Sequence, residues 1–379
     1  MKKILIYDDL ISGHHLEYLS HLLSCVQHQK AKYFFVVPHT IKNIKTSFSS
    51  VDNVEFVYLN DFELRQVLHA GYFLNAYYRS RMISKYAKRY DVDDIFLITL
   101  CHSLPLLPFF LPRKVRVTGI IYRIYFYEWK KLKWITKVKD VLENLVISRF
   151  KAIKHALVLN DSAATCYFNK KYSTSKFVFI PDPIIHVTTP IDSIREKLSI
   201  AEDSQVFLHF GAMCKRKGTL TILNSIKLLD AVSLKNKAFI FAGVIKDDIK
   251  EDFDRIVTEL RQCNVKIIVF NEFCSYSFLL SLCTTADCLL IPYSNVSFSS
   301  GVLGYAALTN SCIIGPKEGL LAKLIRRNHL GTTTDTSNPI SLAEAITQFE
   351  KPKINSNSYC SKNSIANFCS VINRTLFDS

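Results

Sequence analysis

The stretch QVFLHFGAMCKRKGTLTIL, residues 205–223, contains the pattern that decides the fold. An apolar run, Gln205–Phe210, ends at Gly211, and three cations follow at Lys215, Arg216 and Lys217 before a second glycine and a helix-like segment. A buried strand that turns through a glycine-containing loop into a helix is the unit of a parallel sheet. Three consecutive cations at such a turn favour a diphosphate ligand, because lysine offers a point charge and arginine a bidentate fork.

The same strand–helix alternation extends over most of the chain, which has 379 residues, a length typical of two domains. Helices are expected in the first half at segments such as His15–Gln29 and Asn75–Arg89. Continuous apolar runs predict the strands of a sheet that is covered on both faces. In the first half these runs are Lys3–Asp8, Tyr33–Pro38, Val54–Leu59, Asp94–Leu100, Ala156–Asn160 and Phe177–Ile180.

The pattern restarts after the proline-rich stretch Pro181–Pro190, which we take as the domain boundary. The predicted second strand series is Gln205–Phe210, Ala238–Ala242, Val265–Phe270, Asp287–Pro292 and Cys312–Gly315, with helices near Leu220–Leu229, Lys250–Cys263, Tyr276–Thr284 and Gly301–Leu308. We therefore expect an α/β protein of two tandem doubly wound, Rossmann-like domains, 1–183 and 184–361, facing a central cleft. An amphipathic helix is expected in the tail, 362–379.

The cysteines and the apolar runs indicate a cytoplasmic protein. The 11 cysteines form no CxxC pair, and no Cys/His cluster has the spacing of zinc ligands, so we expect free, buried thiols and no metal. No apolar run is long enough to span a bilayer, and the apolar run near the N-terminus is too short for a signal peptide.

The net charge of +15 is concentrated in the first half, which carries +12. In the segment 113–134 basic residues alternate with Trp, Tyr and Phe, a composition typical of a membrane interface. We expect this segment to contact an anionic membrane surface. The alternative is a strand at Val115–Tyr122 followed by an ordinary basic helix. No nucleic-acid-binding motif is present, so a nucleic-acid partner is not expected.

Ligands of doubly wound sheets bind beyond the carboxyl ends of the strands, which makes the strand-end loops the candidate sites. After the first strand come Gly13, His14 and His15, where a glycine and free backbone amides suit an acceptor or a phosphate. His102 follows the fourth strand. We take His14 and His102 as the catalytic candidates, since histidine exchanges protons near neutral pH. A surface loop with a capped helix and a satisfied histidine are the alternatives.

Two loops of the second half complete the candidate site. Ser299, Ser300 and Gly301 begin a helix, whose exposed amides would bind phosphate oxygens. The alternative is ordinary helix capping. The loop after a further strand, Asn271-Glu272-Phe273, is a plausible rim for a nucleobase.

These motifs resemble the GT-B glycosyltransferases of the retaining family 4 type. The resemblance is carried by the glycine loop after the first strand, by IPDPI at the domain junction, by FGAMCKRKG, and by CLLIPYSNVSFSSGVLGYAALTNSCIIGPKEGLLAKLI, residues 288–325. It implies that Lys217, with Lys215 or Arg216, binds the diphosphate of a nucleotide sugar, and that the Ser299–Gly301 loop holds phosphate and sugar. The family carries two glutamates eight positions apart, where this chain has Ser297 and Tyr305.

The resemblance implies sugar transfer to a glycan or lipid-linked glycan acceptor in surface polysaccharide synthesis, such as lipopolysaccharide or capsule, at the inner face of the cytoplasmic membrane. Retention is implied as well, with the leaving phosphate accepting the acceptor's proton. Because cations and a helix terminus can neutralise the leaving diphosphate, we expect no metal and no cofactor. The replaced glutamates keep one alternative open, a non-catalytic module of the same fold that binds a nucleotide sugar or glycan.

Overall fold

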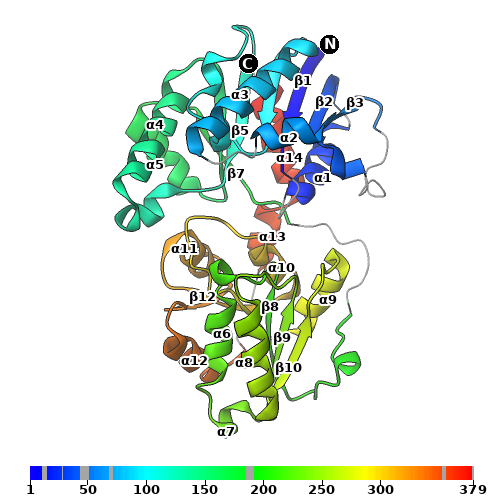
Figure 1. Ribbon diagram of the computed structural model, residues 1–379, viewed down its shortest axis with the longest axis vertical. Coiled ribbons are helices and arrows are strands. Elements are labelled where there is room, and N and C mark those ends of the chain that lie inside the picture. Colours follow the sequence, from blue (N-terminus) through cyan, green and yellow to red (C-terminus); the bar gives the residue numbers. More distant parts are fainter. Residues whose placement is uncertain are drawn as a thin grey trace. The chain divides into compact units, whose positions relative to one another are not determined.

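The computed structural model describes residues 1–10, 15–27, 29–42, 51–67, 71–184, 192–351 and 356–377. The chain divides into two compact units (Figure 1). Unit 1 consists of Met1–Tyr125, Trp129–Pro183 and Ser364–Ser379, and unit 2 of Phe126–Glu128 and Ile184–Asn363. The chain therefore builds most of unit 1, then unit 2, and returns to unit 1 with its last helix.

Unit 1 is built on a seven-stranded parallel sheet in the order β3-β2-β1-β4-β5-β6-β7. The run KKILIY forms β1, and its Ile4 is in register with Tyr33 of β2 and with Asp94 of β4. The strand order reverses between β1 and β4, so this pair is the switch point of the sheet. The strands are β1 (Lys2–Tyr7), β2 (Ala31–Pro38), β3 (Val54–Leu59), β4 (Asp94–Leu97), β5 (Arg116–Ile121), β6 (Ile153–Leu159) and β7 (Phe177–Ile180).

Helices cover this sheet because its strands are apolar on both faces: Leu5, Ile6 and Phe35 are fully buried. The connection after β5 begins with the short helix η4 (Tyr125–Lys131) and continues into α4. The α-helices of unit 1 are α1 (His15–Val26), α2 (Asp61–Val67), α3 (Tyr72–Arg89), α4 (Trp134–Arg149), α5 (Ser162–Tyr172) and α14 (Ile365–Phe377).

Unit 2 repeats this design with a six-stranded parallel sheet in the order β10-β9-β8-β11-β12-β13. Its switch point lies between β8 and β11. The strands are β8 (Gln205–Phe210), β9 (Lys237–Ala242), β10 (Lys266–Phe270), β11 (Cys288–Leu290), β12 (Cys312–Pro316) and β13 (Gly331–Thr334). The helices are α6 (Thr219–Ile226), α7 (Ala231–Leu234), α8 (Lys250–Gln262), α9 (Tyr276–Thr285), α10 (Val302–Thr309), α11 (Gly319–Arg327), α12 (Pro339–Thr347) and α13 (Asn357–Lys362).

Several helices begin at polar side chains that satisfy the free amides of the first turn. Asp161 accepts hydrogen bonds from the amides of Ala163 and Ala164 at the start of α5, both at 3.1 Å. Ser275 accepts from the amide of Phe278 at the start of α9. Such caps stabilise a helix by about 1 kcal/mol and fix where it starts.

The prediction of two Rossmann-like α/β domains is confirmed. Two strands were not among the predicted ones: β5, which appeared only as the alternative for Val115–Tyr122, and β13. The short β13 reads GTTT, which lacks the apolar run by which the other strands are recognised.

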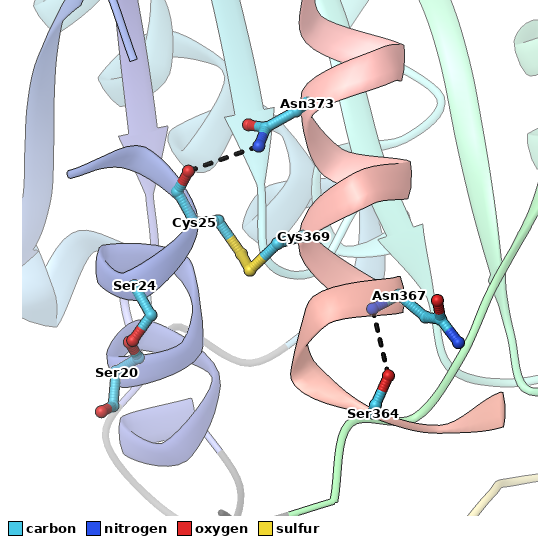
Figure 2. Close-up of a disulfide and its surroundings, with 7 residues drawn as sticks. All are labelled: Ser20, Ser24, Cys25, Ser364, Asn367, Cys369 and Asn373. Atoms are coloured by element: carbon cyan, nitrogen blue, oxygen red, sulfur yellow. Dashed lines mark hydrogen bonds between the residues drawn. A yellow bond between two sulfur atoms is a disulfide. The ribbon is translucent and has the colours of Figure 1, made fainter. Parts of the chain in front are cut away.

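The prediction that the cysteines remain free thiols is wrong at two positions. Cys25 at the end of α1 forms a disulfide with Cys369 of α14, with the Cα atoms 4.8 Å apart (Figure 2). Asn373 Nδ2 donates to the carbonyl of Cys25 beside it. The pairing is hidden in the sequence, because 344 positions separate the two residues and only the return of α14 to unit 1 brings them together. The other nine cysteines are free.

Candidate functional site

The three cations Lys215–Lys217 form a short 3₁₀ turn, η6, between β8 and α6. The turn ends at Gly218, whose φ of 71° lies in the left-handed region. A Cβ atom there would lie 2.2 Å from the carbonyl oxygen of Pro292, so this position requires glycine for two independent reasons. The cations are therefore held at the carboxyl end of β8, at the switch point of the unit 2 sheet.

The loop after β11 packs directly against this turn. The Lys217 ammonium lies 3.7 Å from the centroid of the Tyr293 ring, a close cation–π contact. The amide of Ser294 donates to the carbonyl of Arg216 at 3.1 Å. Lys217 is half-buried, whereas Lys215 and Arg216 are exposed. Lys217 is thus the cation whose position is most strongly defined by its neighbours.

A buried histidine, which sequence reasoning missed, fixes this junction. His209 of β8 donates from Nδ1 to the carbonyl of Leu290 at 2.9 Å, and its Nε2 lies 3.0 Å from the hydroxyl of Thr219. Burial is the main cause that lowers the pKa of His209 to about 4, so the ring is neutral at pH 7 and Nε2 accepts from the hydroxyl. His209 therefore ties β8 to β11 and to the first residue of α6. A histidine inside an otherwise apolar strand was the available signal.

Ser299, Ser300 and Gly301 lie in the connection between β11 and α10, as predicted for a helix start. The amide of Val302 donates to Ser300 Oγ at 3.4 Å. Gly301, the residue directly before α10, has an ordinary φ of −55° and provides no side-chain cap. The loop follows β11 and the Lys215–Lys217 turn follows β8, so the two predicted phosphate-binding segments extend from adjacent strands.

Ser297 and Tyr305, which stand where the family has its two glutamates, lie in the interior of unit 2. Ser297 is fully buried, and its Oγ has no hydrogen-bond partner among the described residues. Tyr305 is also buried, and its ring packs edge-on against Phe210 at 5.2 Å. Neither side chain offers the carboxylate that the glutamates of the family would supply.

Asn271, Glu272 and Phe273 follow β10, at the same edge of the sheet. Asn271 Oδ1 accepts from the amide of Ile245 at 2.9 Å and so ties the loop after β10 to the loop after β9. The side chain of Phe273 is 82% exposed. An exposed ring on a fixed loop is compatible with stacking on a flat ligand.

At the switch point of unit 1, His15 lies at the start of α1, while Gly13 and His14 lie outside the described residues. His15 Nδ1 is 2.7 Å from Asp8 Oδ2, and both side chains are buried. Burial raises the pKa of Asp8, and the contact with His15 opposes that shift. The next residue, Asp9, accepts from Arg79 Nε at 2.6 Å. These acids were missed, although two aspartates directly after the first strand were a visible signal.

His102 lies in the short helix η2 (Cys101–Ser103) after β4. It lines a cavity of about 10 Å³ together with Asp8, Asp9 and Arg79, so this candidate joins the acids that follow β1. The His102 side chain keeps an exposed edge, but loss of water around the ring, reinforced by Arg79 and His15, lowers its pKa to about 4. His102 is therefore neutral at pH 7 and able to accept a proton or a hydrogen bond.

The segment 113–134 divides into an inner and an outer part. Ile120 is buried because β5 is an interior strand of the sheet, and Tyr122 and Tyr125, which follow β5, are buried as well. The strand alternative for Val115–Tyr122 therefore describes this part. Lys130, Lys131 and Trp134 are exposed. Arg113 and Lys114 are exposed as well, so both ends of the predicted membrane segment are accessible and its middle is buried.

No group of three or more metal-binding side chains occurs within the described ranges. Across the same residues, no helix is both long and apolar enough to cross a bilayer.

The fold is that of known glycosyltransferases. Sucrose-phosphate synthase from Thermosynechococcus elongatus superposes with a TM-score of 0.71 at 13% identity, covering 100% of this chain and 99% of that one. WaaG, a glycosyltransferase involved in lipopolysaccharide biosynthesis, gives 0.70 at 14% identity with 100% of both chains covered. HepE from Anabaena, in complex with UDP and glucose, gives 0.68 at 14% identity with 99% of both chains covered.

The sequence of unit 2 carries the family assignment. No curated protein sequence matches the chain. Residues 190–366 match the family described as glycosyl transferases group 1, and this range contains the cation turn, the β11–α10 loop and the Asn271 loop. Residues 190–366 are thus similar to the glycosyl transferases group 1 family, and both units together have the GT-B fold of the glycosyltransferases named above.

Proposed function

We propose that the enzyme takes its sugar from a nucleoside diphosphate donor held by unit 2. The observation that carries the proposal is the Lys215–Lys217 turn, fixed at the switch point by Gly218 and by the ring of Tyr293. HepE, which shares the fold, has been crystallised with UDP and with UDP-glucose. Cations and free helix amides are the groups that bind a diphosphate in such folds.

In the proposed reaction Lys217, with Lys215 or Arg216, neutralises the charge that develops on the leaving diphosphate. The amides at the start of α10, beside Ser299, Ser300 and Gly301, add a second positive pole. With these charges in place the reaction needs neither a metal nor a cofactor. The exposed ring of Phe273, with Asn271 and Glu272, forms the rim for the nucleobase.

The acceptor half of the proposal is assigned to unit 1. His102 and His14 are the groups we propose to contact the acceptor hydroxyl, with Gly13 and His15 in the same loop. The family resemblance supports a retaining reaction in which the leaving phosphate takes the hydroxyl proton. A glycan or lipid-linked glycan of a surface polysaccharide is the proposed acceptor, which agrees with the biosynthetic role stated for WaaG. A cytoplasmic enzyme held at an anionic membrane through segment 113–134 would meet such an acceptor.

Replacement of Lys217 tests the donor site. Lys217→Ala should weaken binding of the preferred nucleotide sugar at least tenfold, because a charge-assisted contact contributes roughly 1.5–3 kcal/mol. Isothermal titration calorimetry and turnover, both in EDTA, are the measurements.

The matched control is Lys235→Ala, which removes an exposed lysine just before β9, at the opposite edge of the sheet. The affinity of Lys235→Ala for the nucleotide sugar and its turnover should equal those of the unchanged protein. Normal donor binding in a folded Lys217→Ala protein would contradict the assignment, and turnover that requires added Mg²⁺ or Mn²⁺ would contradict metal independence.

A further inference from the structure

Helix α4 of unit 1 has polar side chains on its buried face and large apolar side chains on its exposed face. The buried face carries Asp140, Glu143 and Asn144 beside Val146 and Ile147, each less than 10% exposed. The opposite face carries large apolar side chains exposed to solvent: Trp134 75%, Ile135 62%, Val138 55%, Leu142 38% and Leu145 40%. We call these five residues the α4 stripe. Their spacing of three and four positions places most of them along one side of the helix.

The buried carboxylates of α4 accept hydrogen bonds from other side chains of unit 1, and these bonds fix the orientation of the helix. Arg123 donates to Asp140 at 2.8 Å, and the Tyr72 hydroxyl donates to Glu143 at 2.6 Å. A rotation that buried the α4 stripe would bring both carboxylates into solvent and break these contacts. The stripe is therefore a stable feature of the folded unit, and an exposed apolar patch of this kind marks an interaction site.

The surroundings of the α4 stripe are positively charged. Residues 129–151 contain seven Lys and Arg residues, and their two acids are the buried Asp140 and Glu143. A groove of about 490 Å³ runs along the stripe, bounded by Trp129 and the stem of Lys137, whose ammonium lies 5.3 Å from the centroid of the Trp129 ring. The Tyr72–Glu143 bond also brings the start of α3 to α4, and Phe73 there is 61% exposed.

We propose that the α4 stripe inserts into the headgroup–acyl boundary of an anionic lipid bilayer. Apolar side chains bordered by lysines and two tryptophans, with no exposed carboxylate among residues 129–151, match the chemistry of that boundary. A protein partner with a complementary surface would need acids to meet these cations, whereas anionic headgroups supply them along the whole helix. This inference rests on the proposed function, in which the enzyme works at a membrane. It places the membrane contact on α4, whereas the sequence predicted it in segment 113–134.

Intrinsic fluorescence tests the insertion directly, because the chain has only two tryptophans, Trp129 and Trp134, both at this surface. In Trp129→Phe the emission comes from Trp134 alone. Vesicles of phosphatidylcholine and phosphatidylglycerol should shift this emission to shorter wavelength, and lipids brominated on the acyl chains should quench it. Unchanged emission with vesicles that bind the protein would overturn insertion.

Two matched double variants distinguish binding through the α4 stripe from nonspecific adsorption of exposed apolar side chains. Val138→Ser with Leu142→Ser should lower co-sedimentation with the anionic vesicles roughly tenfold or more, since apolar burial supplies much of the binding. The control, Val232→Ser with Ile340→Ser, removes two exposed apolar side chains of unit 2 and should leave vesicle binding unchanged. Equal losses in both pairs, or no loss in either, would overturn the proposal.

Two further readouts complete the test. Binding of the nucleotide sugar to the Val138/Leu142 variant should be normal, so loss of vesicle binding with intact donor binding supports the membrane role independently of the donor site. Light scattering without lipid should show the same mass for this variant and the unchanged protein. A dimer that the variant dissociates would assign the stripe to a second copy of the chain and overturn the lipid proposal.

Discussion

At the scale of single residues, the buried Glu143 of α4 makes the stability of the folded state depend on pH. Burial is the largest cause that raises the pKa of Glu143 to about 7, while Lys139 and the Tyr72 hydroxyl oppose the shift and Asp140 adds to it. The folded state thus holds a proton that the unfolded chain releases near pH 4.5. Between these pH values the folded state binds more protons, so its stability falls as pH rises.

We predict that the free energy of unfolding decreases by up to about 3 kcal/mol between pH 4.5 and pH 7.5 through this group. Glu143→Gln can still accept from Tyr72 and should flatten that part of the profile. Urea unfolding at several pH values, followed by circular dichroism, measures the effect. A Glu143→Gln profile parallel to that of the unchanged protein would show that Glu143 does not titrate in this range.

Gly218 and Gly301 give a second contrast between single residues. A Cβ at Gly218 would meet Pro292 at 2.2 Å in a left-handed conformation, whereas a Cβ at Gly301 would meet nothing within 4 Å. We predict that Gly218→Ala lowers the free energy of unfolding by at least about 2 kcal/mol, and Gly301→Ala changes it by less than about 0.5 kcal/mol. Thermal unfolding of both variants is the check, and equal midpoints would refute the close approach of the two loops.

At the scale of elements, the pairing of α1 with α14 depends on apolar packing and one covalent bond. Phe368 and Ile372 of α14 are fully buried, and the ring of Phe368 meets that of Tyr18 of α1 at 5.8 Å. The Cys25–Cys369 disulfide lies beside this packing (Figure 2). The helix pair therefore has two independent sources of stability, of which only one responds to a reductant.

We predict that Cys369→Ser lowers the free energy of unfolding by about 2–4 kcal/mol, as the loss of a native disulfide does. Cys166→Ser, which removes an exposed free cysteine of α5, is the control and should have little effect. In the unchanged protein, denatured without reductant, titration should find nine thiols, and eleven after reduction. Eleven thiols before reduction would show that the bond does not form.

At the scale of the whole molecule, the chain leaves unit 1 and comes back to it, while unit 2 is almost continuous. We predict that residues 184–363 fold alone and bind UDP. Residues 1–183 alone should aggregate, because they lack α14, whose Phe368, Ile372 and Leu376 are buried against the rest of unit 1. Each of these side chains contributes roughly 1.5–3 kcal/mol. Joining residues 364–379 to 1–183 through a flexible linker should restore a cooperative unfolding transition. A soluble, cooperatively folded 1–183 fragment would contradict this view.

The sequence predicts the fold well where a local pattern determines it. Continuous apolar runs identify β1, β2 and β8, and the cation turn with its two glycines identifies the loop after β8. Contacts between distant segments could not be read in this way. The disulfide, the Asp9–Arg79 pair and the contact of His209 with Leu290 each need two elements already placed by the fold. The exposed stripe of α4 escaped notice because a helix with its apolar side chains on the exposed face has the same periodicity as an ordinary one.

The bond between Cys25 and Cys369 also determines how the protein responds to a pull on its two ends. Tension applied at Met1 and Ser379 would pass through Met1–Cys25, the sulfur–sulfur bond and Cys369–Ser379, and would bypass every residue between the cysteines. All of unit 2 lies inside that covalent loop. A mechanical load applied between the two termini would therefore leave unit 2 unstretched until a reductant opened the loop.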